Sequence, residues 1–390
     1  MSISGTSSVL RRIRAIAPFP PPGPATIGYA RRIRELKPAR GRANEYILPG
    51  FIDLQINGAY GIDVMSASAG DLLTLAARLA REGVTAWLPT VITAPLDIIE
   101  RADRAIGEAM AAQAEAERTT GGSQPAGAAI LGMHLEGPFI SPRRLGAHPP
   151  IPLEPRGPAL RRILGLRTPR LITLAPELPG ALDAIRRFVA RGVAVAIGHT
   201  DATFAQAVAG VAAGARMFTH LFNAMPPLHH RAPGPAGVAL MRECAARAAI
   251  IADGAHLDPA IARIVYQARG PAGIILTTDR VAPAGADEAS SRVIFGGAIG
   301  GVTVRDGAAR LPDGTLAGGA ATMLEMVRRM FPDFRREDLP AVQQITSGNA
   351  ANLLRLSDRG QLKSRMRADF ILLDRTLNLQ AVFVGGRELS

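Results

Sequence analysis

The sequence predicts an α/β fold: a (β/α)8 barrel of the TIM type, with a small β-sandwich domain formed by the two ends of the chain. Three observations predict it. Short apolar runs alternate with helix-like segments, the runs number eight, and six of them end on a polar residue. Mostly apolar strands that alternate with helices are typical of a parallel sheet covered by helices, and eight such units form a closed barrel.

The eight expected strands are bounded by turn residues and lie at 51–57, 85–92, 129–136, 171–177, 193–200, 217–223, 248–256 and 274–279. Apolar residues recur with helical spacing at 71–83, 96–117, 181–192, 202–214 and 258–270, and again at 320–331 after the eighth strand. Gly83, Gly192, Gly214 and Gly270 stand where helix C-caps belong. The alternation of strand and helix therefore continues through most of the chain.

The two flanks differ from this pattern. We expect residues 1–48 and 365–390 to form the small β domain and residues 49–364 to form the barrel. The tail contains two strand-like runs, "FILLD" and "LQAVFVGG", whereas the Pro- and Arg-rich N-terminal part shows few strand patterns. A Gly-rich stretch at 281–314 contains a plausible hairpin, "VIFGGAIGGVTV".

The composition of the 390-residue chain indicates which kinds of partner and which cellular location to expect. No run reaches the roughly 18 consecutive apolar residues of a membrane span, and the basic start lacks the apolar core of a signal peptide. Cys244 is the only cysteine, so no intrachain disulfide forms, and a cytoplasmic enzyme without a membrane partner fits best. The net charge of +12 suggests nucleic-acid binding, but only two of the 45 basic residues are lysine and the arginines are scattered. We therefore expect no nucleic-acid partner.

Polar residues at the strand ends predict a site. In a barrel of this type the C-terminal ends of the strands meet at one mouth, where the chemistry takes place. A single polar residue at such a position is most simply a feature of the strand-to-loop junction. Six at the same end of different units favour a shared site, and they are Gln55, Glu136, His199, His220, His256 and Asp279.

Glu136, His199 and His220 are the best metal-ligand candidates. Two imidazoles and a carboxylate suit one divalent ion, zinc or ferrous iron, and leave coordination positions open for water and substrate. Asp279, at the end of the eighth strand, can take a proton from water and return it to a leaving group. His134 lies on the same strand face as Glu136, where it is either a ligand or, as we favour, a buried residue that supports the site.

Several motifs together resemble the N-acetylglucosamine-6-phosphate deacetylases of the amidohydrolase superfamily. They are "MHLEGPF" (133–139), "LGAHPP" (145–150), "GHTDA" (198–202), "THLFNAMPPLHHRAPG" (219–234), "ADGAH" (252–256), "TTDRVAPAG" (277–285) and "TLAGGAATM" (315–323). The resemblance implies a reaction in which N-acetylglucosamine 6-phosphate is hydrolysed to glucosamine 6-phosphate and acetate.

The same resemblance implies roles for individual residues. Glu136, His199 and His220 would bind the metal, and Asp279 would act as general base and then as general acid. Ala147 and His148 would line the substrate pocket, with His148 near the acetamide carbonyl, while His256 would hold the sugar. The phosphate would be bound by Asn223, the backbone of Ala224 and Arg231, and the sugar pocket would be lined by Leu316, Ala317 and Gly318. In similar enzymes this arginine reaches across a dimer interface, so a homodimer is implied.

Three departures from the resemblance bear on the site. The superfamily usually begins its first strand with PGFID-x-H-x-H, whereas this chain reads "PGFIDLQING" and has Gln55 and Asn57 at the two histidine positions. We interpret this as a site with one metal, in which the two amides order water or substrate. Arg280 directly follows Asp279, where it either lowers the pKa of the aspartate or points away. The N-terminal segment also lacks the strand-rich opening of similar proteins.

Two alternative functions remain open at this point. The first is deacetylation of another N-acetylhexosamine phosphate, such as N-acetylgalactosamine 6-phosphate, because hydroxyl stereochemistry cannot be read from these motifs. The second is a non-catalytic ligand-binding barrel, which the presence of Asp279 and both metal histidines disfavours.

Overall fold

The computed structural model describes residues 10–19, 21–119, 127–286, 294–295, 299–305 and 307–389. Residues 1–9, 20 and 390 of the predicted small domain lie outside this part, as do residues 293 and 296–298 of the predicted hairpin. On either side of that gap, β16 (Ile294–Phe295) and β17 (Ile299–Gly301) pair antiparallel, as expected for the hairpin.

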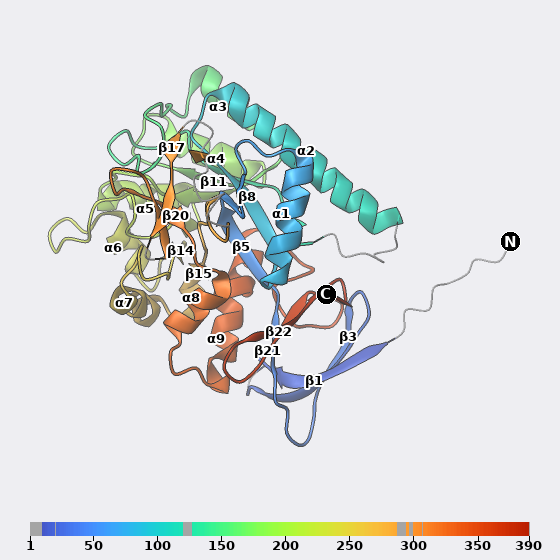
Figure 1. Ribbon diagram of the computed structural model, residues 1–390. Coiled ribbons are helices and arrows are strands. Elements are labelled where there is room, and N and C mark those ends of the chain that lie inside the picture. Colours follow the sequence, from blue (N-terminus) through green and yellow to red (C-terminus); the bar gives the residue numbers. More distant parts are fainter. Residues whose placement is uncertain are drawn as a thin grey trace.

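Eight parallel strands form the barrel, and each lies within or close to one of the eight predicted runs (Figure 1). Their order around the sheet follows their order in the chain. They are β5 (Phe51–Ile56), β8 (Val84–Ile92), β10 (Met133–Glu136), β11 (Pro169–Leu174), β12 (Ala194–Ile197), β13 (Met217–Phe218), β14 (Arg247–Ile250) and β15 (Ile274–Leu276). The predicted run at 129–136 is divided, because β9 (Ala129–Ile130) pairs separately with β8. The barrel predicted from the sequence is therefore confirmed.

Buried polar groups connect the first and last barrel strands. Ile56 forms a parallel bridge with Arg280, and Asn57 N donates to Arg280 O at 2.7 Å. Further down the strands, the Asp53 carboxylate accepts hydrogen bonds from the hydroxyls of Thr277 (2.8 Å) and Thr278 (2.6 Å). These bonds fix the position of strand β5 against the segment that carries Asp279.

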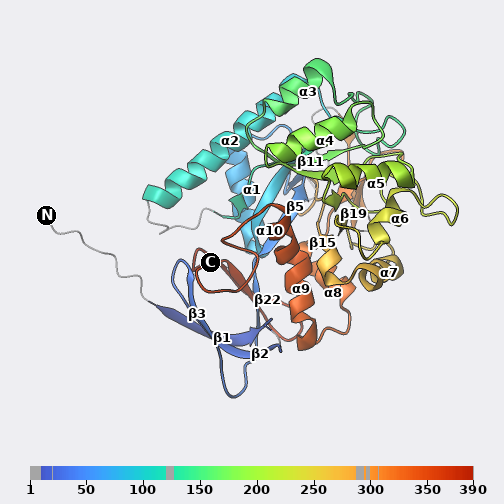
Figure 2. The same cartoon turned by 180° about the vertical axis from the view of Figure 1, so that it is seen from behind.

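Helices cover the outer face of the barrel (Figure 2). They are α1 (Ala69–Arg81), α2 (Leu96–Thr119), α3 (Gly157–Leu164), α4 (Ala181–Ala190), α5 (Phe204–Ala213), α6 (Gly234–Leu240), α7 (Pro259–Arg269), α8 (Met323–Met330) and α9 (Leu339–Gln343). The short α10 (Asn349–Leu353) instead contacts the barrel interior. The helices α3, α6, α9 and α10 were not predicted; all four are short, and α3 and α6 begin with a Gly-Pro pair that interrupts helical spacing. As expected, Gly214 and Gly270 are C-cap residues. Gly83 and Gly192 each come directly after a C-cap residue, and both glycines have a positive φ.

Local capping explains where three helices begin. In α1, Ser68 Oγ accepts from the backbone N–H of Asp71, and the Asp71 carboxylate accepts in return from Ser68 N at 2.9 Å. The same reciprocal pairing occurs between Thr203 and Gln206 in α5 and between Thr322 and Glu325 in α8. A capping box satisfies backbone N–H groups that the first turn leaves without partners, so these sequences set the starts of their helices.

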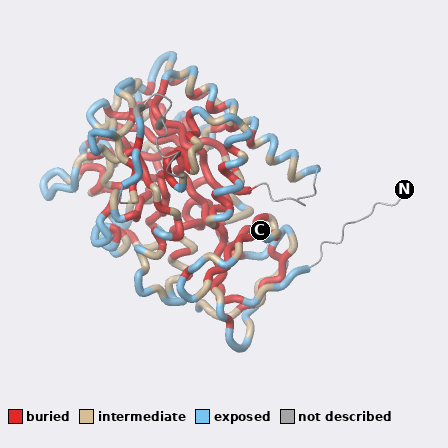
Figure 3. Tube along the Cα trace, in the orientation of Figure 1, coloured by how far each residue is buried: buried red, intermediate tan, exposed pale blue. Residues whose placement is uncertain are grey.

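Two separate hydrophobic clusters fill the barrel domain, and Figure 3 shows the buried chain concentrated in its centre. One cluster lies between the strands and the covering helices. The other fills the barrel interior with apolar residues from most of the barrel strands, such as Leu54, Leu88 and Met217. This inner cluster includes Ala350 and Leu353 of α10, so the segment after α9 closes the N-terminal end of the barrel.

The two ends of the chain build a second sheet of seven strands in the order β23-β22-β21-β4-β1-β2-β3 (Figure 1). They are β1 (Arg11–Ala17), β2 (Gly23–Tyr29), β3 (Ile33–Pro38), β4 (Tyr46–Pro49), β21 (Phe370–Leu373), β22 (Leu379–Val384) and β23 (Arg387–Glu388). The two tail strands match the prediction, and the N-terminal strands that the sequence pattern barely shows are present. Their own cluster packs Tyr29 edge-on against Phe370 at 5.0 Å. The proposed domain limits at residues 48 and 365 stay a prediction.

Short sheets complete the rim of the barrel. The antiparallel pair of β6 (Gly58–Ala59) and β7 (Ile62–Asp63) follows the first barrel strand. The strands β18 (Thr303–Arg305), β19 (Ala308–Arg310) and β20 (Leu316–Gly319) form a meander after the eighth. Gly319 N donates to Asp279 O at 2.7 Å, which brings β20 directly over the end of the barrel.

Candidate metal centre and active site

A pocket of about 260 Å³ opens at the C-terminal ends of the barrel strands. Its walls bring together most residues that the sequence predicts for the site, although they are spread over five loops and the strands β10 and β20. The predicted residues that line it are Glu136, Ala147, His148, His199, His220, Asn223, Ala224, His256, Asp279, Leu316, Ala317 and Gly318. Asn57 and Arg310 line it as well. Arg231 is exposed and lies outside this lining.

The centre of the pocket holds three converging side chains. Glu136 Oε1 lies 2.9 Å from His220 Nε2 and 3.2 Å from His199 Nε2, and the two nitrogens are 3.1 Å apart. All three residues are buried. Among the described residues, these three form the one group of three or more His, Cys, Asp or Glu residues whose possible ligand atoms all lie within 4.8 Å of one another. The cluster thus contains the three ligands that the sequence predicts.

The donor chemistry of this cluster fits a cation. His199 Nδ1 lies 3.0 Å from the carbonyl oxygen of Arg144, which keeps the ring proton on Nδ1. The Nε2 lone pair of His199 therefore faces the Glu136 carboxylate, where two electron-rich atoms repel unless a positive ion lies between them. The carboxylate is ionised: burial raises the pKa of Glu136, but the neighbouring His148, His199 and His220 outweigh it and hold that pKa well below its usual value.

His134 supports the strand and is not part of the cluster. Its Nε2 lies 2.8 Å from Thr173 Oγ1 on the neighbouring strand, and the side chain is fully buried. Burial lowers the pKa of His134 to about 4, so the imidazole is neutral near pH 7. This agrees with the preferred interpretation of His134 as a supporting residue.

Strained backbone marks the ends of three of these strands. His199 (φ 47°), His220 (φ 27°) and Asp279 (φ 50°) all lie in the left-handed region, which non-glycine residues rarely adopt. Such conformations cluster at functional sites because the surrounding structure must hold them in place. Here they turn side chains at strand ends into the pocket.

Asp279 is held by the first strand of the barrel. Asn57 Nδ2 donates to Asp279 Oδ1 at 2.7 Å, and Gln55 Nε2 donates to Glu136 Oε1 at 2.9 Å. Burial, and then the nearby Glu136 charge, raise the pKa of Asp279 well above its usual value, while the Asn57 hydrogen bond lowers it. The two amides that replace histidines thus contact the two carboxylates of the site.

His148 and His256 present one ring nitrogen each to the pocket. His148 Nδ1 lies 2.9 Å from Thr93 Oγ1 and accepts from Thr93 N at 3.4 Å, which places its proton on Nε2, 3.5 Å from Glu136 Oε2. Burial, and then the nearby His199, lower the pKa of His148 to about 4, so this proton belongs to a neutral ring. His256 Nδ1 pairs with Asp253 Oδ2 at 2.7 Å, which leaves its Nε2 free for a ligand.

Arg280 points away from the site. Its guanidinium forms an ion pair with Glu82, the C-cap residue of α1, and lies 5.1 Å from the ring centre of Tyr60. Asp279 lines the active-site pocket and Arg280 does not, so the charge that follows Asp279 in sequence lies on the other side of the segment. Of the two alternatives for Arg280, the structure therefore supports the one in which it points away.

Sequence reasoning missed Arg310 as a pocket residue. It lies at the end of β19, donates to Gly314 O at 3.1 Å, and has no acidic partner among the described residues. A lone arginine before a "PDG" turn is most simply a solvated charge, so no sequence signal identifies it. Only the fold of the β18–β20 meander brings it over the barrel mouth.

A (β/α)8 barrel with a buried Glu-His-His cluster and a carboxylate at the eighth strand is the arrangement of a metal-dependent hydrolase. The sequence profile described as "Amidohydrolase family" matches residues 46–389. This chain belongs to the amidohydrolase family.

Within this family, the chain is similar to deacetylases that act on N-acetylhexosamine phosphates. The N-acetylglucosamine-6-phosphate deacetylase of Bacillus subtilis (strain 168) is 37% identical over 343 residues, covering 86% of this chain and 83% of the relative. The N-acetylgalactosamine-6-phosphate deacetylase of Escherichia coli O157:H7 is 35% identical over 353 residues, covering 90% and 89%. A solved mutant of the N-acetyl-D-glucosamine-6-phosphate deacetylase of Mycobacterium smegmatis, in complex with N-acetyl-D-glucosamine 6-phosphate, aligns with a TM-score of 0.83 at 30% identity. That alignment covers 97% of this chain and 99% of the solved one.

Proposed function

We propose that this chain hydrolyses the N-acetyl group of N-acetylglucosamine 6-phosphate, giving glucosamine 6-phosphate and acetate. The observation that carries the proposal is one pocket in which Asp279, His148 and His256 surround the cluster of Glu136, His199 and His220. The names of the relatives support the substrate.

The metal ligands in this proposal are Glu136, His199 and His220. A divalent ion held by them would supply Lewis acidity, which polarises an amide carbonyl and makes hydroxide available near neutral pH. We propose one zinc or ferrous ion per chain, because an N,N,O donor set suits these borderline ions.

Two residues of the chain act on the amide. The neutral His148 donates its Nε2 proton to the acetamide carbonyl oxygen and so stabilises the charge that develops there. Asp279 accepts the proton of the attacking water at a carboxylate oxygen and then returns it to the leaving amine. Its raised pKa suits this double role, because a carboxyl with a pKa nearer neutrality both gains and loses a proton readily.

Pocket walls hold the rest of the substrate. We propose that His256 holds a sugar hydroxyl, that Ala147, Leu316, Ala317 and Gly318 line the sugar, and that Asn223 and the backbone of Ala224 bind the phosphate. Arg231 is exposed on the loop after Asn223, outside the pocket of its own chain. This position supports a homodimer in which Arg231 contacts the phosphate bound by a second copy.

The proposal also includes a cellular location. No helix in the described part of the chain is long and apolar enough to cross a membrane. We propose a cytoplasmic location, which a single cysteine and a phosphorylated substrate support.

A substrate panel tests the proposal. Metal-supplemented protein is assayed for acetate release from N-acetylglucosamine 6-phosphate, N-acetylgalactosamine 6-phosphate and unphosphorylated N-acetylglucosamine. We expect the highest kcat/KM on N-acetylglucosamine 6-phosphate. A higher kcat/KM on N-acetylgalactosamine 6-phosphate, the substrate in the name of the Escherichia coli relative, favours the galactosamine alternative. If none is turned over and Asp279→Asn binds them as tightly as the unmodified protein, the chain is a ligand-binding barrel.

A further inference from the structure

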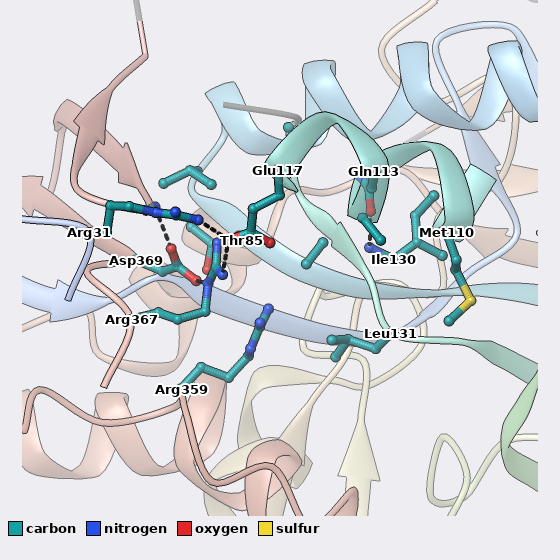
Figure 4. Close-up of a pocket in the computed structure, with 15 residues that line it drawn as sticks. Arg31, Thr85, Met110, Gln113, Glu117, Ile130, Leu131, Arg359, Arg367 and Asp369 are labelled. Carbon is teal, nitrogen blue, oxygen red and sulfur yellow. Dashed lines mark hydrogen bonds and ion pairs between the residues drawn. The ribbon is translucent and has the colours of Figure 1, made fainter. Parts of the chain in front are cut away.

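A second cavity, of about 220 Å³, lies at the end of the barrel opposite the metal centre (Figure 4). Thr85 near the start of β8 lines it, whereas Ile92 at the end of the same strand lines the active-site pocket. Seven residues of extended strand place these two points roughly 23 Å apart. The cavity is therefore separate from the site already described.

Three parts of the chain meet at this cavity. Arg31 comes from the N-terminal part of the small sheet, Glu117 from the last turn of α2, and Arg359, Arg367 and Asp369 from the segment that enters the C-terminal strands. Figure 4 shows Arg31 and Arg367 converging on Glu117. Each donates to Glu117 Oε1 at 2.7 Å, and Arg367 Nε also donates to Asp369 Oδ2 at 3.0 Å.

The carboxylates do not use all the guanidinium donors. Arg359 is 11% exposed and pairs with Asp358 through Nε and Nη2, at 3.0 and 3.1 Å. Its Nη1 is buried and has no hydrogen-bond partner within the described part of the chain. Arg31 is half exposed, and its ion pair with Glu117 uses only Nη2. Three arginines and two carboxylates line the cavity, and Asp358, the ion-pair partner of Arg359, lies outside that lining.

The surroundings of the cavity add positive charge and an apolar wall. Arg31 and Arg367 are shared with a neighbouring hollow that Arg32 and Arg34 also line, so positive charge surrounds the mouth. The inner wall contains Met110, Ile130, Leu131 and Val384. An ion-pair network that serves only to join the two domains has no need of a buried donor without a partner, since such a donor is costly.

We propose that this cavity binds a phosphate group, carried by a small phosphate monoester or present as inorganic phosphate. Guanidinium groups recognise phosphate oxygens through paired, charge-assisted hydrogen bonds. The free Nη1 of Arg359 and the spare donors of Arg31 supply these from two sides, and the apolar wall accommodates the carbon part of an ester. Because the groups come from both domains, a bound phosphate would link the small sheet to the barrel.

Calorimetric titration with inorganic phosphate and with glycerol 3-phosphate tests this proposal. We expect Arg31→Gln and Arg359→Gln each to weaken one binding event about tenfold or more, the loss of a charge-assisted hydrogen bond. Arg161→Gln, an exposed change of equal charge on α3 at the far end of α2, is the matched control and should bind as the unmodified protein does. Glu117→Gln should bind at least as tightly, since it removes the competing carboxylate. Tighter binding of glycerol 3-phosphate than of phosphate identifies an ester as the ligand, and the reverse order identifies the free ion.

Hydrogen exchange separates this site from the active site. Phosphate should protect backbone amides at 113–119 and 359–369, and Arg31→Gln should remove that protection. Arg31 is exposed, so this variant decides the matter even if Arg359→Gln fails to fold. Equal affinities in Arg31→Gln and Arg161→Gln, or protection confined to the active-site loops, would overturn the proposal.

Discussion

The side-chain amide of Asn57 donates a 2.7 Å hydrogen bond to the carboxylate of Asp279, although the two residues are 222 positions apart in the sequence. They come from the first and last strands of the barrel, which meet through the bridge between Ile56 and Arg280. On the same strand as Asn57, Gln55 donates to Glu136 at 2.9 Å. The first strand, in which similar proteins carry two histidines, thus holds the two carboxylates of the proposed reaction.

Asn57→Leu should shift the pH dependence of turnover. The Asn57 hydrogen bond lowers the pKa of Asp279, which burial and the Glu136 charge raise. Without the bond this pKa rises further, so the ionised base forms only at higher pH and the acid limb of the kcat/KM profile moves upward. The same substitution at the exposed Asn352 is the control. An unchanged acid limb would show that Asn57 does not tune the base.

Restoring both histidines should add a metal. Gln55→His combined with Asn57→His returns two imidazoles to positions whose amides now contact the site carboxylates. We expect metal content to rise from one equivalent per chain toward two, measured by elemental analysis after gel filtration. If the double variant gains no metal, the two amides do not stand in the place of a second ion.

Arg310→Gln should weaken the binding of phosphorylated substrate. Arg310 is the one arginine in the described lining of the active-site pocket, and it has no acidic partner among the described residues. We expect KM for the phosphorylated substrate to rise about tenfold, the loss of a charge-assisted contact, with little change in kcat. Arg305→Gln, on an exposed strand of the same meander, is the control. An equal loss with unphosphorylated N-acetylglucosamine would rule out a phosphate contact.

The metal-free protein should lose stability in mild acid. Burial lowers the pKa of His134 and of His148 to about 4 in the folded chain, against about 6.5 in an unfolded one. Between these values the unfolded chain binds more protons, so the free energy of unfolding falls as the pH drops from about 6.5 to 4. Urea unfolding at several pH values measures the slope, and His134→Gln should make it shallower. An equal slope in that variant would contradict the assignment.

Much of this molecule follows from local sequence pattern. The eight barrel strands are visible because each is a short apolar run, and the order of polar strand ends correctly indicates Glu136, His199 and His220 as neighbours. The capping boxes at Ser68 and Thr322 are also local signals. Such features depend on residues close together in the chain.

What the sequence did not predict depends on contacts between distant segments. The N-terminal strands are rich in arginine and proline, and their stability comes from pairing, as between Leu48 and Ile371, which no local pattern records. Arg310 reaches the pocket only because a meander after the eighth strand folds back over it. The contact of Asn57 with Asp279 likewise requires barrel closure. These residues could be placed only once the topology was known.

Removal and return of metal tests the central claim most directly. Protein treated with a chelator should release no acetate from N-acetylglucosamine 6-phosphate, and activity should return in proportion to added zinc or ferrous ion up to one equivalent per chain. His199→Ala should recover little activity under the same titration, because it removes one of the three ligands. Full turnover by protein that retains less than about half an equivalent of divalent metal would contradict the account.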